Sequence, residues 1–491
     1  MTLGFPGWRR AGMAALCGVA AALGQAPLGL WPLAMLGLIL LMVLVKQADG
    51  ARDAAWLAWA AGLGHFALAL SWIISPFLVE PEVYGWMAPF ALVLMAAGMA
   101  LFWALAGALS GLARHRALGF AVALAGAEAL RGVVLTGFPW AMIGHIWVDT
   151  AFAHLVAGIG VNGLNLLTLL VVACFALRRG WMFVAVGVVL AGWLAGDGLR
   201  RVQPGPARDI TLRLVQPNAT QDLKWDADMA RENFARLLDL TGVQPVADLT
   251  IWPETAVPYL MDTAPEVGQM IAVASGGRPV IVGYQRVDGA QGWNSLGLIG
   301  TDGTVLQHYD KAHLVPFGEY IPFGDIAYDW FGLQAFASQL GAAYSAGAGP
   351  AVMDLGPELG VILPLICYEA IFPAALNAVP ARADWILQIT NDAWFGTLTG
   401  PWQHVAQVRF RAIEQGLPVV RVANTGVTAV YDAHGQVVAE LPFGQAGALN
   451  VAQIPGALPP TPYSRWGEGP FMLLLAGVVA ALVLARKRKP A

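Results

Sequence analysis

In the stretch Val361-Ile-Leu-Pro-Leu-Ile-Cys367-Tyr-Glu369, a short apolar run leads directly into a cysteine. The run is rich in branched side chains and predicts a buried β-strand that ends at the thiol. The other cysteines, Cys17 and Cys174, lie inside hydrophobic segments, so Cys367 has no evident disulfide partner. A lone thiol at a strand end is a candidate nucleophile, and the alternative is a small buried side chain of the core.

Similar short runs recur on both sides of Cys367, between residues 208 and 455. They alternate with the helical patterns Asp226–Leu240 and Pro401–Gln415, which predicts an α/β fold whose sheet is covered on both faces. Functional groups of such folds gather at the strand ends. The predicted strands are Thr211–Val215, Leu249–Trp252, Val280–Tyr284, Leu296–Ile299, Val361–Ile366, Trp385–Ile389 and Val419–Val422.

The composition separates this α/β region from the rest of the chain. Of the 491 residues, 57% are hydrophobic and 12% are charged, whereas soluble proteins carry about 25% charged residues. Residues 1–200 and 468–486 are apolar, and residues 208–455 have the composition of a soluble domain. The net charge of -4 and the lack of a basic stripe with interleaved aromatic residues argue against nucleic acid as a partner.

Apolar segments before and after the α/β region predict a membrane protein. A helix needs about 20 apolar residues to cross the hydrocarbon core of a bilayer. The first segment follows Arg9 and Arg10 and could be a signal peptide, but a second apolar segment follows at once and favours an uncleaved helix. The predicted spans are Ala11–Leu23, Leu28–Val45, Ala54–Ile74, Met87–Leu112, Leu118–Leu135, Ala157–Leu177 and Met182–Leu194, then Gly469–Ala485.

The distribution of basic residues predicts the orientation of these spans. The loop Ser75–Gly85 holds glutamates and no basic residue, whereas Arg200 and Arg201 oppose the pattern but enter a large domain whose charges count little. Both termini are expected in the cytoplasm of a bacterium, and residues 208–455 in the periplasm. A free thiol in that oxidising compartment needs a reason, and catalysis is one. The basic residues expected inside are Arg9, Arg10, Lys46, Arg52, Arg114, Arg116, Arg178, Arg179, Arg486, Lys487, Arg488 and Lys489.

Glu254 and Lys311 can supply what a thiol nucleophile needs for acyl transfer. Glu254 ends a predicted strand and is a candidate general base, and the Lys311 ammonium could stabilise an oxyanion. A helix expected near Ala370–Val379 would lower the pKa of the Cys367 thiol through its N-terminus. Alone, Glu254 could be a helix-start carboxylate and Lys311 a solvated surface lysine.

The histidines do not point to a metal. His313 and His404 lie in no HxxxH or CxxC spacing, so a structural role is expected for both, with no metal and no cofactor.

The order Glu254, Lys311, Cys367 resembles the nitrilase (carbon–nitrogen hydrolase) superfamily. Within it, the chain is similar to the apolipoprotein N-acyltransferase family, which joins N-terminal membrane helices to a periplasmic nitrilase-like domain and one C-terminal helix. The resemblance implies a multi-helix integral membrane bundle of seven helices at 1–200, an α/β nitrilase-like α-β-β-α sandwich at 208–455, and a transmembrane helix at 468–486. The matching motifs are Trp252-Pro-Glu254, Lys311-Ala-His-Leu-Val-Pro-Phe-Gly-Glu319, Ile366-Cys-Tyr-Glu369 and Asn391-Asp-Ala-Trp-Phe-Gly396.

The resemblance also implies roles for individual residues. Glu254 would be the general base, Lys311 the oxyanion stabiliser and Cys367 the nucleophile. The supporting active-site residues would be Glu319, Tyr368 and Glu369. The expected substrate-binding residues are Trp225, Trp330, Phe331 and Trp394. Trp293-Asn294-Ser295, where the family has tyrosine before Asn-Ser, and Ala406-Gln-Val-Arg409 depart from the family pattern and leave local lipid contacts in doubt.

The implied reaction moves an acyl chain from a phospholipid, expected to be phosphatidylethanolamine, to Cys367. The acyl chain then passes to the α-amine of a diacylglyceryl-modified apolipoprotein, at the bacterial inner membrane and without need of more than a monomer. The aromatic segment Ile321–Ala346 is expected to form a lid that dips into the lipid interface, and the alternative is a loop packed on the domain. A membrane-tethered amidase with the same three residues, and a transporter or lipid-binding protein with an inert domain, are the competing hypotheses.

Overall fold

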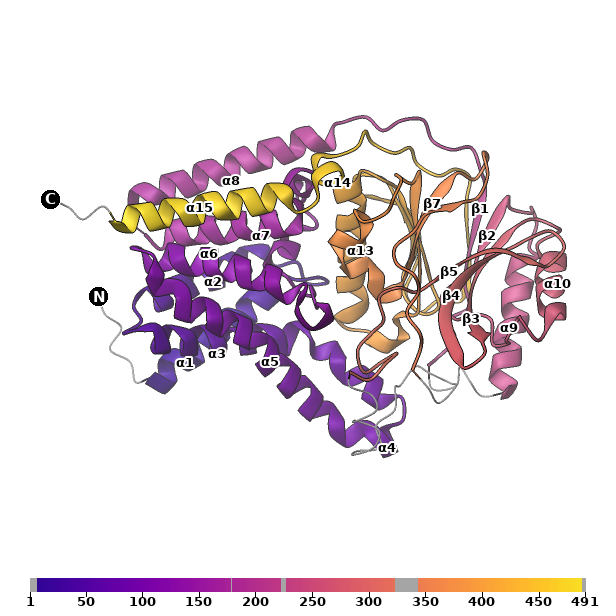
Figure 1. Ribbon diagram of the computed structural model, residues 1–491, viewed down its shortest axis with the longest axis horizontal. Helices are drawn as coiled ribbons and strands as arrows, with labels where there is room; N and C mark the ends of the chain where they lie inside the picture. The colour runs from indigo at the N-terminus through magenta and orange to yellow at the C-terminus, as the bar shows by residue number, and fades with distance from the viewer. Residues whose placement is uncertain (1–6, 178, 222–226, 323–342, 488–491) are drawn as a thin grey trace. The chain divides into compact units, whose positions relative to one another are not determined.

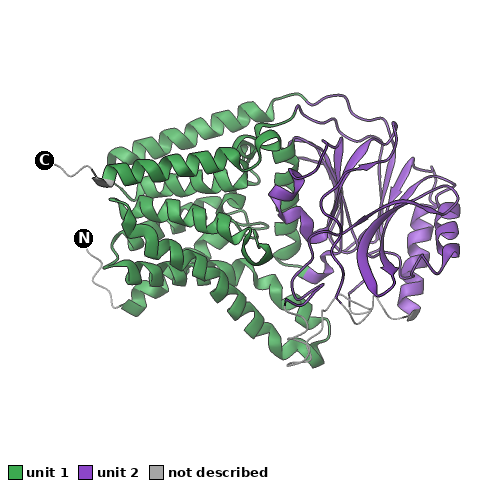
Figure 2. Cartoon of the chain, viewed as in Figure 1, with its two compact units in different colours: residues 1–203, 395–415, 460–491 green, residues 204–394, 416–459 purple. Residues whose placement is uncertain are grey.

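A computed structural model describes residues 7–177, 179–221, 227–322 and 343–487 (Figure 1). The chain divides into two compact units (Figure 2). Unit 1 comprises residues 1–203, 395–415 and 460–491, and unit 2 comprises residues 204–394 and 416–459. Trp225, Trp330, Phe331 and most of the expected lid lie outside the described residues.

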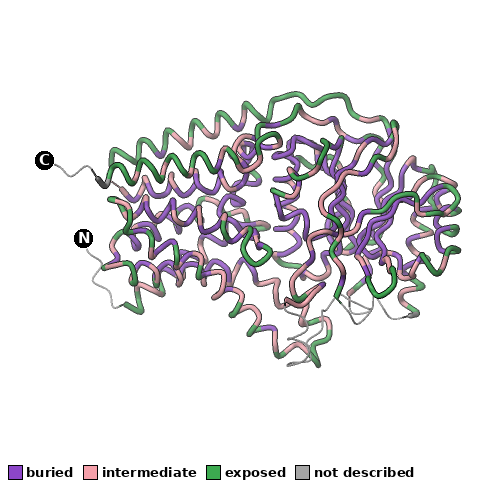
Figure 3. The backbone as a smooth tube through the Cα atoms, viewed as in Figure 1, coloured by how far each residue is buried: buried purple, intermediate pink, exposed green. Residues whose placement is uncertain are grey.

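Unit 1 is helical, and each apolar segment predicted from the sequence contains a helix. Helices suit such segments because their backbone groups are satisfied within the helix and need no water. Figure 3 shows α8 exposed along most of its length, and only Ala185 and Gly196 of α8 are buried. The long helices are α1 (Gly7–Ala22), α2 (Trp31–Lys46), α3 (Ala51–Ala69), α5 (Ala88–Leu109), α6 (Arg116–Arg131), α7 (Val156–Phe175), α8 (Arg179–Arg200), α13 (Gly400–Gln415) and α15 (Gly469–Lys487).

Among the described residues, three helical stretches are long and apolar enough to cross a membrane. They are Pro81–Leu112, Ala151–Phe175 and Arg179–Arg200, and the bent pair Ala51–Ala69 and Ser71–Leu78 would be a fourth. Trp31–Lys46 and Gly469–Ala485 are shorter apolar helices. The predicted total of eight spans therefore stays a prediction.

Small residues bring the helices of unit 1 close together. A Cβ atom added to Gly18 of α1 would lie 1.8 Å from the carbonyl oxygen of Ala61 in α3. One added to Gly107 of α5 would lie 2.4 Å from the carbonyl oxygen of Ala54 in α3. Close backbone approach at small residues is typical of helices that pack within a membrane.

Helix α13 belongs to unit 1, although the chain around it belongs to unit 2. The indole Nε1 of Trp140 donates to Oε1 of Gln403 on α13 at 2.6 Å. The backbone N–H of Val161 on α7 donates to Oε1 of Glu414 at 3.0 Å. These buried polar contacts bind α13 to the helices of unit 1 over its whole length.

The described residues of unit 2 form two six-stranded sheets. β1 packs against β9 and β4 against β7, and Thr428 Oγ1 donates to Gln216 Oε1 at 2.6 Å from one sheet to the other. The first sheet has the order β12 (Gly447–Val451), β1 (Leu212–Gln216), β2 (Leu249–Ile251), β3 (Val280–Asp288), β4 (Gln291–Ile299), β5 (Val305–Asp310). The second has the order β11 (Val437–Leu441), β10 (Thr428–Tyr431), β9 (Val419–Ala423), β8 (Trp385–Thr390), β7 (Val361–Ile366), β6 (Met353–Asp354).

Helices α9 (Ala227–Thr241) and α10 (Pro265–Ala274) pack on the first sheet. Phe234 of α9 and Ile271 of α10 join Trp252 and Tyr284 in a buried apolar core. This is the two-sheet α/β sandwich expected from the resemblance, so the predicted fold class is confirmed.

Polar residues of the site follow the ends of strands in both sheets. β1, β2 and β3 are parallel in the first sheet, and β7, β8 and β9 are parallel in the second. Ile366 pairs with Ile389, so Cys367 and Thr390 are the next residues at the same level of the second sheet. Glu254 follows β2 and Lys311 follows β5 in the first sheet.

Candidate active site

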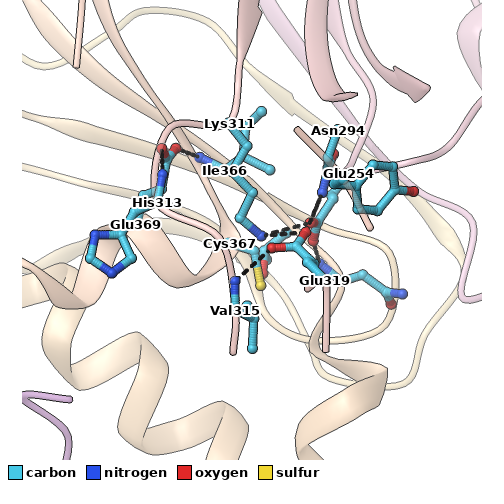
Figure 4. Close-up of polar contacts among 12 residues, drawn as sticks. Glu254, Asn294, Lys311, His313, Val315, Glu319, Ile366, Cys367 and Glu369 are labelled. Carbon is cyan, nitrogen blue, oxygen red and sulfur yellow. Dashed lines mark hydrogen bonds and ion pairs between the residues drawn. The ribbon is translucent and has the colours of Figure 1, made fainter. Parts of the chain in front are cut away.

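Cys367 lies at the sharp turn between β7 and the 3₁₀ turn η7 (Cys367–Ile371). Its φ of 51° is in the left-handed region, which a residue with a Cβ adopts only at an energetic cost. The carbonyl of Cys367 accepts a hydrogen bond from Gln388 Nε2 at 3.1 Å. The side chain is buried, and Figure 4 shows its sulfur beside Lys311 and the carboxylates of Glu254 and Glu319.

Lys311 lies between two carboxylates. Its Nζ is 2.9 Å from Oε1 of Glu319 and 3.5 Å from Oε1 of Glu254, and its side chain is only 1% exposed. Burial disfavours the ammonium, but Glu319, Glu254 and the Cys367 sulfur outweigh it and raise the pKa of Lys311 above its usual value. Lys311 is therefore a fixed positive charge beside the thiol.

Buried donors hold Glu254 in place. Asn294 Nδ2 donates to Oε1 at 2.7 Å, the Asn391 backbone N–H donates to Oε2 at 2.8 Å, and Lys311 Nζ lies 3.5 Å from Oε1. Asn294 Nδ2 also lies 3.0 Å from Oε1 of Glu319, whose Oε2 accepts from the Val315 N–H at 2.9 Å. Both carboxylates are therefore fixed in place before any substrate arrives.

Burial and the charge of Glu254 raise the pKa of the Cys367 thiol above its usual value, and Lys311 opposes this. This shift favours the neutral thiol, which needs a base to become a nucleophile. The helix expected near Ala370–Val379 is present as the four-residue α12 (Pro373–Leu376), and the 3₁₀ turn η7 separates it from the thiol. The pKa of the thiol is raised, so the lowering expected from a helix N-terminus is wrong.

Glu369 ties the two strand ends together. Its Oε1 accepts from the Tyr309 hydroxyl at 2.8 Å and from the Ala312 N–H at 2.8 Å, while its Oε2 accepts from the Ile366 N–H at 2.7 Å. Burial raises the pKa of this carboxyl. Glu369 thus fixes the loop that carries Lys311 against the end of the strand that leads to Cys367. These contacts are those of a residue that positions its neighbours.

The remaining predicted site residues lie around this group or outside the described chain. Tyr368 packs edge-on against Phe372, with 5.1 Å between ring centroids, and His313 stacks on Phe372 at 3.8 Å. Trp394 is half-buried in the 3₁₀ turn η8 (Asp392–Phe395). Its predicted part in substrate binding stays a prediction, as do those of Trp225, Trp330 and Phe331.

Three polar groups of this site have no assigned role among the sequence predictions, although Asn294 and Asn391 lie in motifs quoted there. The side chain of Asn294 bridges both glutamates, Asn391 contributes its N–H, and Thr390 lies beside Cys367 in the sheet. The signal for Asn391 and Thr390 was their place at the end of β8, next to the end of β7. Asn294 lies within β4, and only the pairing of β4 with β5 brings it to Lys311.

Two family models match the chain. Residues 17–174 match the apolipoprotein N-acyltransferase N-terminal domain, and residues 211–462 match carbon-nitrogen hydrolase.

Relatives match almost the full length. An apolipoprotein N-acyltransferase of Rhodopseudomonas palustris is 37% identical over 522 residues, which cover 99% of this chain and 96% of the relative. One of Caulobacter vibrioides is 37% identical over 510 residues, which cover 97% and 95%. The solved structure of an amidase from Nesterenkonia sp. is 20% identical, covers 55% of this chain and 98% of its own, and superposes with a TM-score of 0.38.

Proposed function

Because this chain belongs to the apolipoprotein N-acyltransferase family and is an acyltransferase of lipoprotein biosynthesis, we propose that Cys367 carries the acyl group as a thioester. The donor is a membrane phospholipid, with phosphatidylethanolamine as the expected species. The acceptor is the free α-amine of the N-terminal diacylglyceryl-cysteine of a lipoprotein. The reaction then has two half-reactions that share one site.

In the first half-reaction, Glu254 takes the proton of the Cys367 thiol while the sulfur attacks the ester carbonyl of the phospholipid. The Lys311 ammonium stabilises the negative charge that develops on the carbonyl oxygen. The carbon–sulfur bond forms, the ester carbon–oxygen bond breaks, and the lysophospholipid leaves with the proton from Glu254. The neutral resting thiol makes this base necessary.

In the second half-reaction, the lipoprotein amine attacks the thioester carbonyl and gives its proton to Glu254. The carbon–nitrogen bond forms, the carbon–sulfur bond breaks, and the electron pair returns to sulfur. Glu254 then returns the proton to the thiolate. Lys311 serves both tetrahedral intermediates because its charge does not change.

One observation carries this proposal: a buried thiol lies beside a buried ammonium that two carboxylates hold at 2.9 and 3.5 Å. Ionisable groups buried this close together are costly to desolvate, and such clusters are typical of sites where the groups act on one another or on a substrate. A chain of this family that keeps all three therefore has the parts for covalent acyl transfer.

The apolar helices of the chain fit a membrane, and both substrates are lipids. We place the catalytic region in residues 208–455 on the periplasmic side of the bacterial inner membrane. The membrane regions are then 1–200 and 468–486, and both termini are cytoplasmic. A monomer suffices, since the described site residues all come from one chain.

The test is mass spectrometry of Cys367 after the purified protein is incubated with phosphatidylethanolamine. We expect an acyl adduct on Cys367 that a diacylglyceryl-cysteinyl peptide discharges and water does not. Cys367→Ser should lose this thioester, and Cys174→Ser should keep it. An adduct lost to water at the same rate with and without the peptide would support a membrane-tethered amidase instead. No adduct on a folded protein would contradict the proposal.

A further inference from the structure

A second chain of buried polar groups begins at Cys367 and runs away from Glu254 and Lys311. Because Ile366 pairs with Ile389 in parallel strands, Thr390, the next residue of β8, lies beside the turn that begins at Cys367. The Thr390 hydroxyl is a hydrogen-bond partner of the Cys367 sulfur. Thr390 is fully buried, and its Oγ1 also donates to Oδ1 of Asp392 at 3.0 Å.

Arg421 of β9 completes this chain. Its Nη2 lies 2.5 Å from Oδ2 of Asp392, and both side chains are 0% exposed. Its Nη1 also donates to the carbonyl of Val427 at 3.4 Å. A fully buried ion pair is weak evidence for stability, because desolvation offsets the attraction between the charges. The Asp392–Arg421 pair therefore calls for a role that apolar side chains could not fill.

The position of the pair indicates that role. A hydroxyl has one proton to donate and lone pairs to accept with. The Thr390 hydroxyl lies between two groups that can accept a hydrogen bond from it. These are the Asp392 carboxylate and, whenever it is a thiolate, the Cys367 sulfur. Asp392 keeps Arg421 as a partner in either case, so turning the hydroxyl toward sulfur leaves no buried charge without a partner.

We propose that Thr390 donates a hydrogen bond to the Cys367 thiolate each time it forms, and that Asp392 and Arg421 are positioning residues that act through Thr390. The hydroxyl points to Asp392 while sulfur is a thiol or thioester and turns to sulfur when the carbon–sulfur bond breaks. The Thr390 proton stays on Thr390 throughout, and the thiol proton still travels by Glu254. This inference rests on the proposed function for its chemical steps, but its hydrogen bond can be tested without an acyl donor.

The polar and charged groups around the sulfur determine in which direction a substitution moves the pKa of the Cys367 thiol. Glu254 and Asp392 oppose the thiolate, and Lys311 and the Thr390 hydroxyl favour it, with burial as the largest effect. Removing the hydroxyl while keeping the shape of the side chain should therefore raise the pKa of the Cys367 thiol. A hydrogen bond to a charged group is strong enough to move it by about one pH unit.

The first experiment measures the rate of Cys367 alkylation by iodoacetamide against pH in the full-length, detergent-solubilised protein. The adduct is read on the Cys367 peptide, so Cys17 and Cys174 need not be replaced. Thr390→Val should move the profile to higher pH by about one unit, and Thr390→Ser should restore it. Thr428→Val is the matched control, because Thr428 is a buried threonine of β10 bonded to Gln216 rather than to Cys367.

The second experiment measures acyl transfer from phosphatidylethanolamine. Thr390→Val should lower kcat about tenfold with little change in KM, and Thr390→Ser should again restore it. If Thr390→Val does not fold, Thr390→Ala gives the same comparison. A Thr390→Val profile that coincides with the parent, or a Thr428→Val profile that shifts equally, would overturn the proposal.

The two experiments separate this inference from the proposed function. A shifted alkylation profile in a protein that never forms an acyl adduct would keep the hydrogen bond and remove the thioester mechanism. An acyl adduct that forms normally in Thr390→Val, with an unshifted alkylation profile, would keep the thioester mechanism and remove the proposed hydrogen bond.

Discussion

At the scale of the residue, the site is an arrangement of charges that only works as a group. Lys311 is buried, and the cost of burying its ammonium is offset because Glu254 and Glu319 lie within 3.5 Å of its Nζ. The two carboxylates in turn lie close together because Lys311 and the Asn294 amide stand between them. Replacing any one of these side chains should therefore change both the rate of acyl transfer and the free energy of unfolding.

Asn294→Leu should slow formation of the acyl-enzyme by about 10- to 100-fold, because hydrogen bonds to charged groups are worth roughly 1.5–3 kcal/mol. The change leaves Glu254 and Glu319 facing each other with fewer donors. Single-turnover mass spectrometry of Cys367 measures the rate. Gln307→Leu removes an exposed amide from β5 and should leave the rate unchanged. Equal rates in the two variants would show that Asn294 does not position Glu254.

Lys311→Met should raise the pKa of the Cys367 thiol further, because Lys311 is a group that favours the thiolate. Alkylation of Cys367 by iodoacetamide should then need a higher pH than in the parent, and acyl transfer should fall by a factor of about 10²–10³. The same change leaves two buried carboxylates without their cation and should cost about 3–5 kcal/mol of the free energy of unfolding. An alkylation profile that moves to lower pH would contradict this electrostatic assignment.

At the scale of the element, local sequence patterns predict several strands correctly, and the structure contains longer strands and additional ones. The bounds of β7 are those predicted, Val361–Ile366, because that run is apolar throughout and ends at a turn. The sequence did not predict β5, β6, β10, β11 and β12; β11 is largely exposed and β6 has only two residues, so both carry a weak local pattern. Helix α13 was predicted, but its place in unit 1 depends on buried partners far away in the chain.

Gly18→Ala should destabilise the packing of α1 on α3, because the added Cβ would meet the Ala61 carbonyl oxygen at 1.8 Å. Overpacking of this kind costs about 1–3 kcal/mol. Thermal unfolding in detergent should show a lower Tm for this variant. Gly12→Ala lies on the same helix and meets nothing within 4 Å, so its Tm should be unchanged or higher. Similar losses in both variants would mean that helix α1 does not pack closely here.

At the scale of the whole molecule, the family and the enzyme class predicted from the motifs are confirmed. The orientation in the membrane stays a prediction that rests on the basic residues of alternate loops. Its consequence is that residues 208–455 and the chain between α2 and α3 lie on opposite sides of the bilayer.

A single cysteine placed at Thr301 or at Ala51, both exposed positions, tests this orientation. In intact spheroplasts, a membrane-impermeant maleimide should label Thr301→Cys, whereas Ala51→Cys should react only after the membrane is opened. The background is the variant in which Cys17, Cys174 and Cys367 are all serine, so the introduced cysteine is the one thiol left. The opposite labelling pattern would place the catalytic region in the cytoplasm and reverse the predicted topology.

Features that depend only on neighbouring residues could be predicted from the amino-acid order. These are the apolar helices, the strand that ends at Cys367, and the motifs around Glu254 and Lys311, because hydrophobic period and chain order are local properties. The distances within the site, the burial that raises the pKa of the Cys367 thiol, and the contacts of Asn294 and Thr390 with the reacting groups could not be predicted in this way. Those depend on which strands pair and on what excludes water, and both are settled only when distant segments pack together.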